Sequence, residues 1–207
     1  MSQQQLHWAR WLAAILAAAT AYATVRYHFA QPEPWSRFFF WTTNKAFSFA
    51  AAGLLAACYL YVPRDRRMAK ALGLSGFSFA LAHSLLSWPL FHPANYPKLY
   101  QQGSVNDAGL QCIWTGIAAI VLLCSPALAS LNGAKEKLGL RNWTRFQRLG
   151  YAALVFTALH VLAIGYQGWL TPRTWPAALP PITILSFALA TVPVALRLVR
   201  AQGAARA

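Results

Sequence analysis

The sequence predicts an all-α integral membrane protein that folds as one bundle of six transmembrane helices. Of its 207 residues, 57% are hydrophobic and only 11% are charged. Soluble domains carry roughly 25% charged residues, so this shortage of charge indicates a chain that lies mostly in lipid. No segment has the composition of a soluble domain, and no glycine-rich nucleotide-binding loop is present. We therefore expect a single membrane domain over residues 1–207.

Six apolar stretches are long enough to cross a bilayer as helices, which takes about 20 residues each. Segments that carry proline, glycine and charge separate them, at 31–34, 63–65, 92–97, 132–133 and 171–180. The first stretch has no persuasive signal-peptide cleavage site after it, so we expect it to be a retained span. The expected spans are residues 8–25, 46–62, 71–91, 110–131, 147–170 and 181–199.

The basic residues are distributed unevenly between the two sides of this topology. Thirteen of the eighteen Lys and Arg residues fall at the termini and in the second and fourth connections. Because Lys and Arg concentrate in cytoplasmic loops, this pattern places both termini in the cytoplasm. A net charge of +14 is also typical of nucleic-acid-binding proteins, but here the charge is not gathered on one face. We expect membrane lipid, and no nucleic acid, as a partner.

Two histidines, His83 and His160, lie deep inside apolar stretches. An ionisable side chain at membrane depth is costly and marks a functional site by default. The third and fifth spans run in the same direction, and a rise of 1.5 Å per residue puts the two rings about 15 Å and about 20 Å from the cytoplasmic side. Two imidazoles at matched depth can bind one haem iron from opposite sides. We expect one haem b between these spans, with both histidines as its axial ligands.

Structural roles for the same histidines are the alternative, with hydrogen bonds to Ser84 and Thr157 across a helix pair. A proton relay is less compatible with the sequence, because it needs acidic or Lys partners at depth and all four acids fall in predicted connections. His7, His28 and His92 lie near span ends or in connections, where interfacial or solvated histidines are common. Small residues near the two deep histidines leave room for a flat macrocycle or simply pack helices: Gly76, Ala80, Ala82, Ala153 and Thr157.

The three cysteines, Cys58, Cys112 and Cys124, fall inside apolar stretches without a paired spacing. Neither a disulfide framework nor a zinc site is indicated by such a pattern. We expect all three to be small buried thiols.

Ordered landmarks around the deep histidines resemble the ferric reductase-like transmembrane domain family. The stretches LGLSGFSFALAHSLLS and WTRFQRLGYAALVFTALHV carry most of the likeness, which covers about residues 45–170. Within the family, they resemble the haem-binding membrane subunits of periplasmic methionine sulfoxide reductase systems. The matching landmarks are Arg66-Arg67, Leu72-Gly73, His83, Thr115-Gly116, Leu138-Gly139, Trp143, the run 148–151 and His160.

The resemblance implies a protein of the bacterial inner membrane that passes electrons from the cytoplasmic side to a periplasmic acceptor. That acceptor would be a molybdenum-containing methionine sulfoxide reductase, and a cytoplasmic flavin reductase or the quinone pool would supply the electrons. A stand-alone reductase of ferric iron or of another outer acceptor is one alternative, and a haem-free membrane scaffold or carrier is another. The expected docking residues in the outer connections are Trp35, Arg37, His92, Tyr96, Lys98 and Tyr100.

One departure from the family pattern limits the number of haems. Members with a second, inner haem have L-H-R-L at the start of the fifth span, whereas this chain has Phe146-Gln147-Arg148, with Lys70 at the matching place in the third span. The resemblance therefore implies one haem, in the middle to outer half of the membrane. A flavin (FMN or FAD) or a quinone could lie near the cytoplasmic side, and its candidate contacts are Lys70, Arg145, Gln147 and Arg148. The alternative is that these four residues are ordinary polar and positively charged residues of a cytoplasmic boundary.

Overall fold

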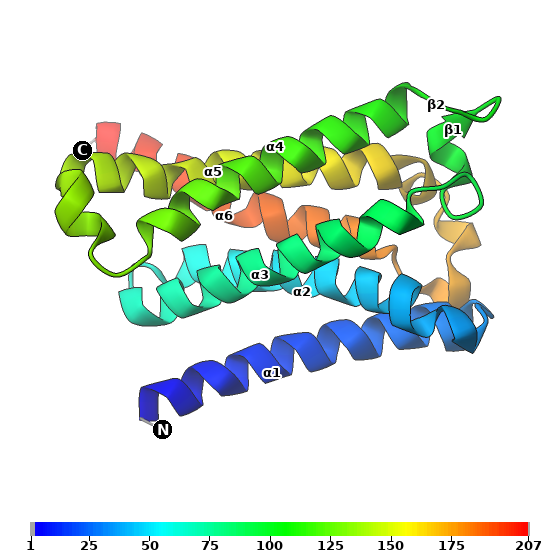
Figure 1. The fold of residues 1–207 in the computed structure, drawn as a ribbon, viewed down its shortest axis with the longest axis horizontal. Helices are drawn as coiled ribbons and strands as arrows, with labels where there is room; N and C mark the ends of the chain where they lie inside the picture. The colour runs from blue at the N-terminus through cyan, green and yellow to red at the C-terminus, as the bar shows by residue number, and fades with distance from the viewer. Residues whose placement is uncertain (1–2, 207) are drawn as a thin grey trace.

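The computed structural model describes residues 3–206 and forms an elongated bundle of long helices (Figure 1). Its long helices are α1 Gln3–Thr24, α2 Thr43–Tyr61, α3 Arg66–Leu90, α4 Asp107–Ala129, α5 Ala134–Trp169 and α6 Ile182–Arg206. Strands β1 Tyr100–Gln101 and β2 Ser104–Val105 pair antiparallel in one small hairpin. The short helices are η1 Val25–Ala30, η2 Trp35–Arg37, η3 Phe38–Thr42, η4 Pro97–Leu99, η5 Pro172–Thr174 and η6 Pro176–Ala178. This architecture agrees with the expected all-α class.

Five of the expected spans correspond to helical segments that are long and apolar enough to cross a membrane. Helix α2, the expected second span, is not among them, because its 19 residues begin with the polar Thr43, Asn44 and Lys45. It packs against α1, α3 and α6 instead of facing outward over its whole length. By length and composition, the membrane-crossing segments of the described chain are Leu6–Ala30, Arg66–Leu90, Asp107–Ala129, Ala134–Trp169 and Pro176–Gly203.

Successive long helices alternate in direction, so that α1 begins and α6 ends at the same end of the bundle (Figure 1). The connections 62–65 and 130–133 also lie there, and we call this the basic end because most Lys and Arg residues of the chain belong to it. The opposite end holds the β1–β2 hairpin together with residues 31–37 and 170–181, and we call it the hairpin end. Helices α3 and α5 both run from the basic end to the hairpin end.

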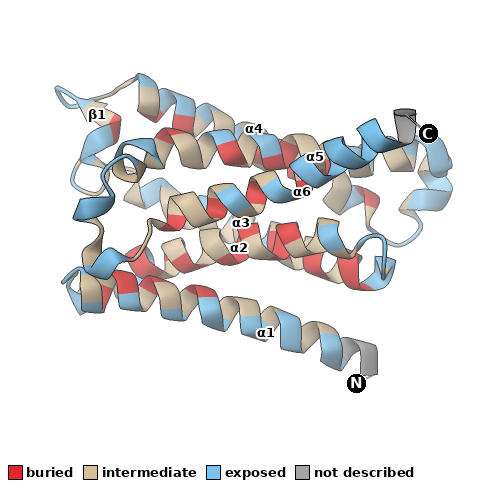
Figure 2. Cartoon of the chain, turned by 180° about the vertical axis from the view of Figure 1, so that it is seen from behind, coloured by how far each residue is buried: buried red, intermediate tan, exposed pale blue. Residues whose placement is uncertain are grey.

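The interior is made of small and aliphatic side chains from four helices. One cluster joins Leu55 of α2, Leu123 of α4, Leu154 of α5 and Ala190 of α6. Figure 2 shows the buried residues on the faces that the helices turn toward one another. Large apolar side chains also point outward, and Trp88 is 87% exposed. An outward apolar surface of this kind is what contact with lipid requires.

A glycine bends α5 near its start. Gly139 has φ 69° and ψ 157°, a left-handed conformation that glycine adopts without a steric cost. The bend separates the short segment before it from the long helix that carries His160. The straight part of α5 therefore begins after the Leu138-Gly139 landmark.

The hairpin end is fixed on α4 by a close backbone contact. Asn106 caps α4, since its Oδ1 accepts a hydrogen bond from the Gly109 amide at 2.9 Å. A Cβ atom at Gly109 would lie 2.5 Å from the Leu99 carbonyl oxygen. Leu99 in turn packs in a buried cluster with Cys112 and Ala163. Gly109 thus lets the hairpin segment lie directly on the helices that carry the site.

Replacing Gly109 with alanine is expected to destabilise the protein. Overpacking of this kind costs about 1–3 kcal/mol, which corresponds to roughly 2–12 °C in Tm for a chain of this size. The matched control is Gly168→Ala in α5, where an added Cβ meets no atom within 4 Å. Thermal unfolding of both variants in the same detergent measures the difference. Equal Tm values would show that the hairpin segment does not rest on α4 in this way.

Candidate functional site

The rings of His83 and His160 lie beside each other inside the bundle. Their centres are 6.4 Å apart and their planes are inclined by 74°. His83 lies seven residues before the end of α3, and His160 lies nine residues before the end of α5. The structure therefore brings together the two deep histidines that the sequence singled out, in the half of the bundle nearer the hairpin end.

The separation of the two rings suits a shared metal. A bond between a metal and an imidazole nitrogen is about 2 Å long, and that nitrogen lies about 1 Å from the ring centre. Two rings that bind one metal from opposite sides therefore have centres about 6 Å apart, which the observed 6.4 Å matches. Helices α2 and α4 hold each ring at this distance.

The ring of His83 is held by a buried asparagine. Asn44 Oδ1 accepts a hydrogen bond from His83 Nδ1 at 2.7 Å, and Asn44 itself is fully buried. The Asn44 amide nitrogen donates to Ser87 Oγ at 3.1 Å, one turn after His83 on α3. Because Oδ1 can only accept, the proton of the neutral imidazole is on Nδ1. The lone pair of Nε2 is then free to bind a metal.

The ring of His160 is held by a backbone carbonyl. The Cys112 carbonyl oxygen accepts a hydrogen bond from His160 Nδ1 at 2.9 Å, and Cys112 Sγ lies 3.5 Å from the same nitrogen. A Cβ atom at Gly116 would lie 2.9 Å from His160 Nδ1, so a larger residue would push the ring aside. The two histidines thus share one arrangement, in which Nδ1 is occupied by an acceptor. Metal-binding histidines are commonly oriented in this way.

This pair fits a haem. In the described part of the chain, Nε2 of neither ring has a hydrogen-bond partner, and both histidines are only partly buried. No group of three or more His, Cys, Asp or Glu residues gathers anywhere in that part. A zinc site would need three or four protein ligands, whereas haem iron takes only its axial ligands from the protein.

The hydroxyl groups considered as alternative partners do not reach the histidines. Ser84 Oγ donates to the Ala80 carbonyl at 2.9 Å, and Thr157 Oγ1 donates to the Ala153 carbonyl at 2.9 Å. Both hydroxyl groups therefore satisfy a carbonyl of their own helix. The polar partners of the two rings come from Asn44 and Cys112 instead.

Some of the small residues near the histidines pack helices. A Cβ at Gly76 already has Leu55 of α2 within 2.9 Å, so this glycine allows α2 and α3 to approach closely. Ala153 is fully buried in the core cluster with Leu55. Gly116, by contrast, lies directly against the ring of His160 and has no side chain that would displace it.

The remaining histidines have separate roles. His28 was expected to be interfacial or solvated, but it is 8% exposed and bonds Thr42 Oγ1 at 2.7 Å through Nε2 and the Glu33 carbonyl through Nδ1. These bonds tie η1, which follows α1, to η3, which precedes α2, and they explain the burial of His28. His7 and His92 are exposed, as expected.

Most of the expected docking residues hold the outer connections together. Trp35 stacks on His28, Arg37 pairs with Glu33 at 2.7 Å and bonds Asn95, and Tyr100 Oη donates to the Phe91 carbonyl at 3.0 Å. Tyr96 accepts a hydrogen bond from Lys45. The exposed members of the set are Trp35, His92 and Lys98.

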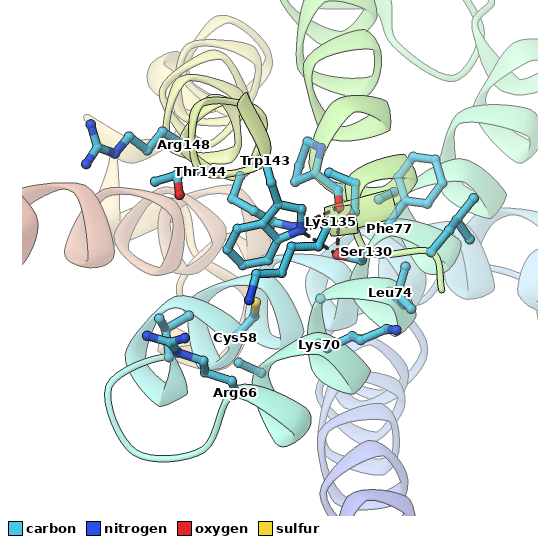
Figure 3. A pocket seen from close by; sticks show the side chains of 18 of the residues that line it. Cys58, Arg66, Lys70, Leu74, Phe77, Ser130, Lys135, Trp143, Thr144 and Arg148 are labelled. Atoms are coloured by element: carbon cyan, nitrogen blue, oxygen red, sulfur yellow. Dashed lines mark hydrogen bonds between the residues drawn. The ribbon is translucent and has the colours of Figure 1, made fainter. Parts of the chain in front are cut away.

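A cavity of about 680 Å³ opens at the basic end between α2, α3, α4 and α5 (Figure 3). It includes Lys70, Gln147 and Arg148 among its lining residues, but not Arg145. After the bend at Gly139, the residues of α5 that line the cavity, at 140, 143, 144, 147, 148 and 151, recur every three or four positions and share one face of the helix. Arg145 falls on another face, which explains why it is not part of the cavity.

The cavity combines positive charge with aromatic faces. Six basic residues line it against one acid, Glu136. Lys135 Nζ lies 5.8 Å from the centre of the Trp143 ring, and Figure 3 shows the two side chains next to each other. The aromatic lining was not predicted from the sequence, where the position of Trp143 near a span end was the available signal. The basic residues are Arg66, Arg67, Lys70, Lys135, Arg148 and Arg197, and the aromatic ones are Tyr59, Phe77, Trp143 and Tyr151.

Comparison with known proteins gives one distant likeness. No model of a known protein family matches the chain. The Metalloreductase STEAP2 proteins of Mus musculus and Homo sapiens are each 29% identical to it over 171 residues. The match covers 69% of this chain and 35% of either relative, so the chain spans about a third of the relatives' length. Together with the five apolar helices, this likeness supports a multi-pass membrane protein.

Replacing Asn44 with leucine is expected to destabilise the site, because the Nδ1 group of His83 then loses its acceptor inside the bundle. Leaving a buried donor unsatisfied costs about 1–3 kcal/mol. The matched control is Ser48→Ala one turn later on α2, since Ser48 Oγ bonds only the Lys45 carbonyl of its own helix. Unfolding of both variants in detergent gives the comparison. A Ser48 variant that loses as much stability as the Asn44 variant would contradict the role assigned to Asn44.

Proposed function

We propose that this chain is a b-type haem protein of the bacterial inner membrane that carries electrons from its basic end to its hairpin end. The observation that carries the proposal is the pair of imidazole rings 6.4 Å apart, each with Nδ1 bound to an acceptor. His83 and His160 are the axial ligands in this proposal. The distant likeness to a metalloreductase supports redox chemistry at such a site.

The protein residues set the state of the ligands. Asn44 and the Cys112 carbonyl keep the protons on Nδ1, so that both Nε2 atoms are available to the metal. When bound, haem supplies a carrier of single electrons. Because both axial positions are taken by histidine, the site favours electron transfer over the binding of oxygen. The apolar helices around the pair exclude water from it.

The direction of transfer rests on the charge of the two ends. The basic end carries most Lys and Arg residues, which favours a cytoplasmic location for it and for both termini. With α2 counted as a span, the chain crosses the membrane six times. The hairpin end then faces the periplasm, and the histidine pair lies in the outer half of the membrane.

The cavity at the basic end is the proposed site of electron delivery. Its cations suit an anionic group, and its aromatic side chains suit a planar ring. We assign it to a flavin, FMN or FAD, or to a quinone, with Lys70, Gln147 and Arg148 among its contacts. Phe77, which lines the cavity, lies six residues before His83, about 9 Å along the helix. A cytoplasmic flavin reductase or the quinone pool is the proposed electron source.

The proposed acceptor is a periplasmic molybdenum reductase of the MsrP type, which makes this chain an MsrQ-like subunit of a methionine sulfoxide reductase system. The likeness of the sequence landmarks to that branch supports this choice. His92, Lys98 and the open face of Trp35 offer the docking surface at the hairpin end.

A second candidate is a stand-alone reductase of ferric iron or another metal, which the likeness to STEAP2 favours. The two functions share the histidine pair and differ at the hairpin end. Reduction of a ferric chelate by the purified, pre-reduced protein without a partner supports the second candidate. Reoxidation of the pre-reduced protein only when a methionine sulfoxide reductase and methionine sulfoxide are both present supports the first candidate.

Replacing either deep histidine with alanine is expected to abolish or strongly perturb haem binding, because each supplies one axial ligand. His92→Ala is the control, since His92 is exposed at the hairpin end. Reduced-minus-oxidised spectra of haem-replete preparations measure the effect, together with a haem-to-protein ratio near one in the wild type. A normal low-spin spectrum in either variant, or a ratio near two, contradicts the single bis-histidine site.

Replacing Arg148 with glutamine is expected to lower the flavin or quinone content of the purified protein, because Arg148 lines the cavity. Arg145→Gln removes the same charge three residues earlier on α5, outside the cavity, and should leave the content unchanged. Extraction and chromatography of the bound cofactor compare the two variants. Equal losses would mean that overall positive charge, rather than the cavity, retains the molecule.

A further inference from the structure

One cation beside the histidine pair has no acidic partner. Lys45 lies in the first turn of α2, directly after the Asn44 that holds His83. The ion pair found in the described part of the chain joins Arg37 to Glu33 and leaves Lys45 out. A positive charge within a membrane bundle is costly and usually pairs with another group.

The surroundings of Lys45 are aromatic and offer few acceptors. Its Nζ atom donates to Tyr96 Oη at 2.9 Å and lies 4.4 Å and 4.5 Å from the ring centres of Trp41 and Tyr96. An ammonium group has three hydrogens to donate, and a single hydrogen-bond acceptor is present. Trp41 is 8% exposed, and its Nε1 has no hydrogen-bond partner. The Lys45 ammonium group and the Trp41 indole N–H therefore lie close together, and both can donate further hydrogen bonds.

These donors lie on the hairpin side of both histidines. Asn44 connects Lys45 to the ring of His83. Tyr96 packs against the buried cluster of Leu99, Cys112 and Ala163, and the Cys112 carbonyl holds the ring of His160. The Lys45–Trp41–Tyr96 group thus lies next to Asn44 and against the cluster that contains Cys112, the two residues that orient the rings.

We infer that Lys45 and the Trp41 indole N–H bind a carboxylate of the haem, one of its propionates, on the hairpin side of the His83–His160 pair. The inference rests on the proposed haem site. Haem b brings two carboxylates into a medium of low dielectric constant, where each needs a charge-assisted donor. Of the two acids at the hairpin end, Glu33 is engaged by Arg37, and Asp107 is exposed in the first turn of α4, so that neither forms an ion pair with Lys45 in the described residues. This contact would orient the haem with its carboxylates toward the hairpin end.

The competing interpretation is that Lys45 extends its ammonium group toward the interface and is held there by Tyr96 alone. In that case, the effect of removing the Lys45 charge on the affinity for haem would be the same with and without free haem carboxylates. A double cycle that varies both the protein and the haem separates the two interpretations.

The test is the affinity of the full-length apoprotein in detergent for haem b and for haem dimethyl ester, measured by absorbance titration. We expect Lys45→Gln to weaken binding of haem b by about tenfold or more, as loss of a charge-assisted bond does. The ester should bind wild type and Lys45→Gln with equal affinity. Lys45→Arg should retain most of the affinity for haem b. Arg173→Gln, which removes an exposed charge at the same end, should change neither titration.

Equal weakening of both haems in Lys45→Gln would overturn the inference, because it would show no dependence on the carboxylates. Failure of the wild type to bind either haem would instead overturn the proposed function. If Lys45→Gln unfolds, Trp41→Phe keeps an aromatic ring and removes only the unpartnered N–H. That variant should also weaken the binding of haem b more than the binding of the ester. An equal effect on the two affinities would overturn the inference.

Discussion

The fixed orientation of two imidazole rings is the constraint on which the rest of this structure depends. Each ring donates a hydrogen bond from Nδ1 to an acceptor on a neighbouring helix. The acceptor is the Asn44 side chain for His83 and the Cys112 carbonyl for His160. Helices α2 and α4 therefore set the tautomer and the orientation of the histidine rings on α3 and α5. Gly116 leaves space for the ring of His160, and the buried Asn44 supplies the acceptor for His83.

The two ends of the bundle differ chemically, and the histidine pair lies between them. The basic end presents a cavity with six cations, one acid and several aromatic side chains. The hairpin end presents a tied network of connections, in which His28, Arg37 and Tyr96 hold segments from different helices. The histidine pair inside the bundle thus lies between a cavity and an exposed surface. Such an order suits transfer of electrons through the bundle.

The sequence was sufficient to predict the helical class and the pairing of the two deep histidines, because a titratable ring stands out in an apolar run. Six spans were predicted, and five of them correspond to helices that are long and apolar enough to cross a membrane. Lys70, Gln147 and Arg148, which were predicted to lie on one side, line one cavity. Asn44 and Lys45 were missed as site residues, because they precede the apolar stretch and look like an ordinary span boundary. The burial of His28 depends on Thr42 and Glu33, and Arg145 is excluded from the cavity by helix rotation. Such contacts depend on tertiary packing.

Electron paramagnetic resonance of the oxidised, haem-loaded protein tests the central claim most directly, because it reports the axial ligands and the angle between their planes. Two histidines on one ferric haem give a low-spin signal. Ring planes inclined by 74°, as found here, predict the highly anisotropic form of that signal. A high-spin ferric signal would contradict the account, since it would mean that His83 and His160 do not both bind the iron.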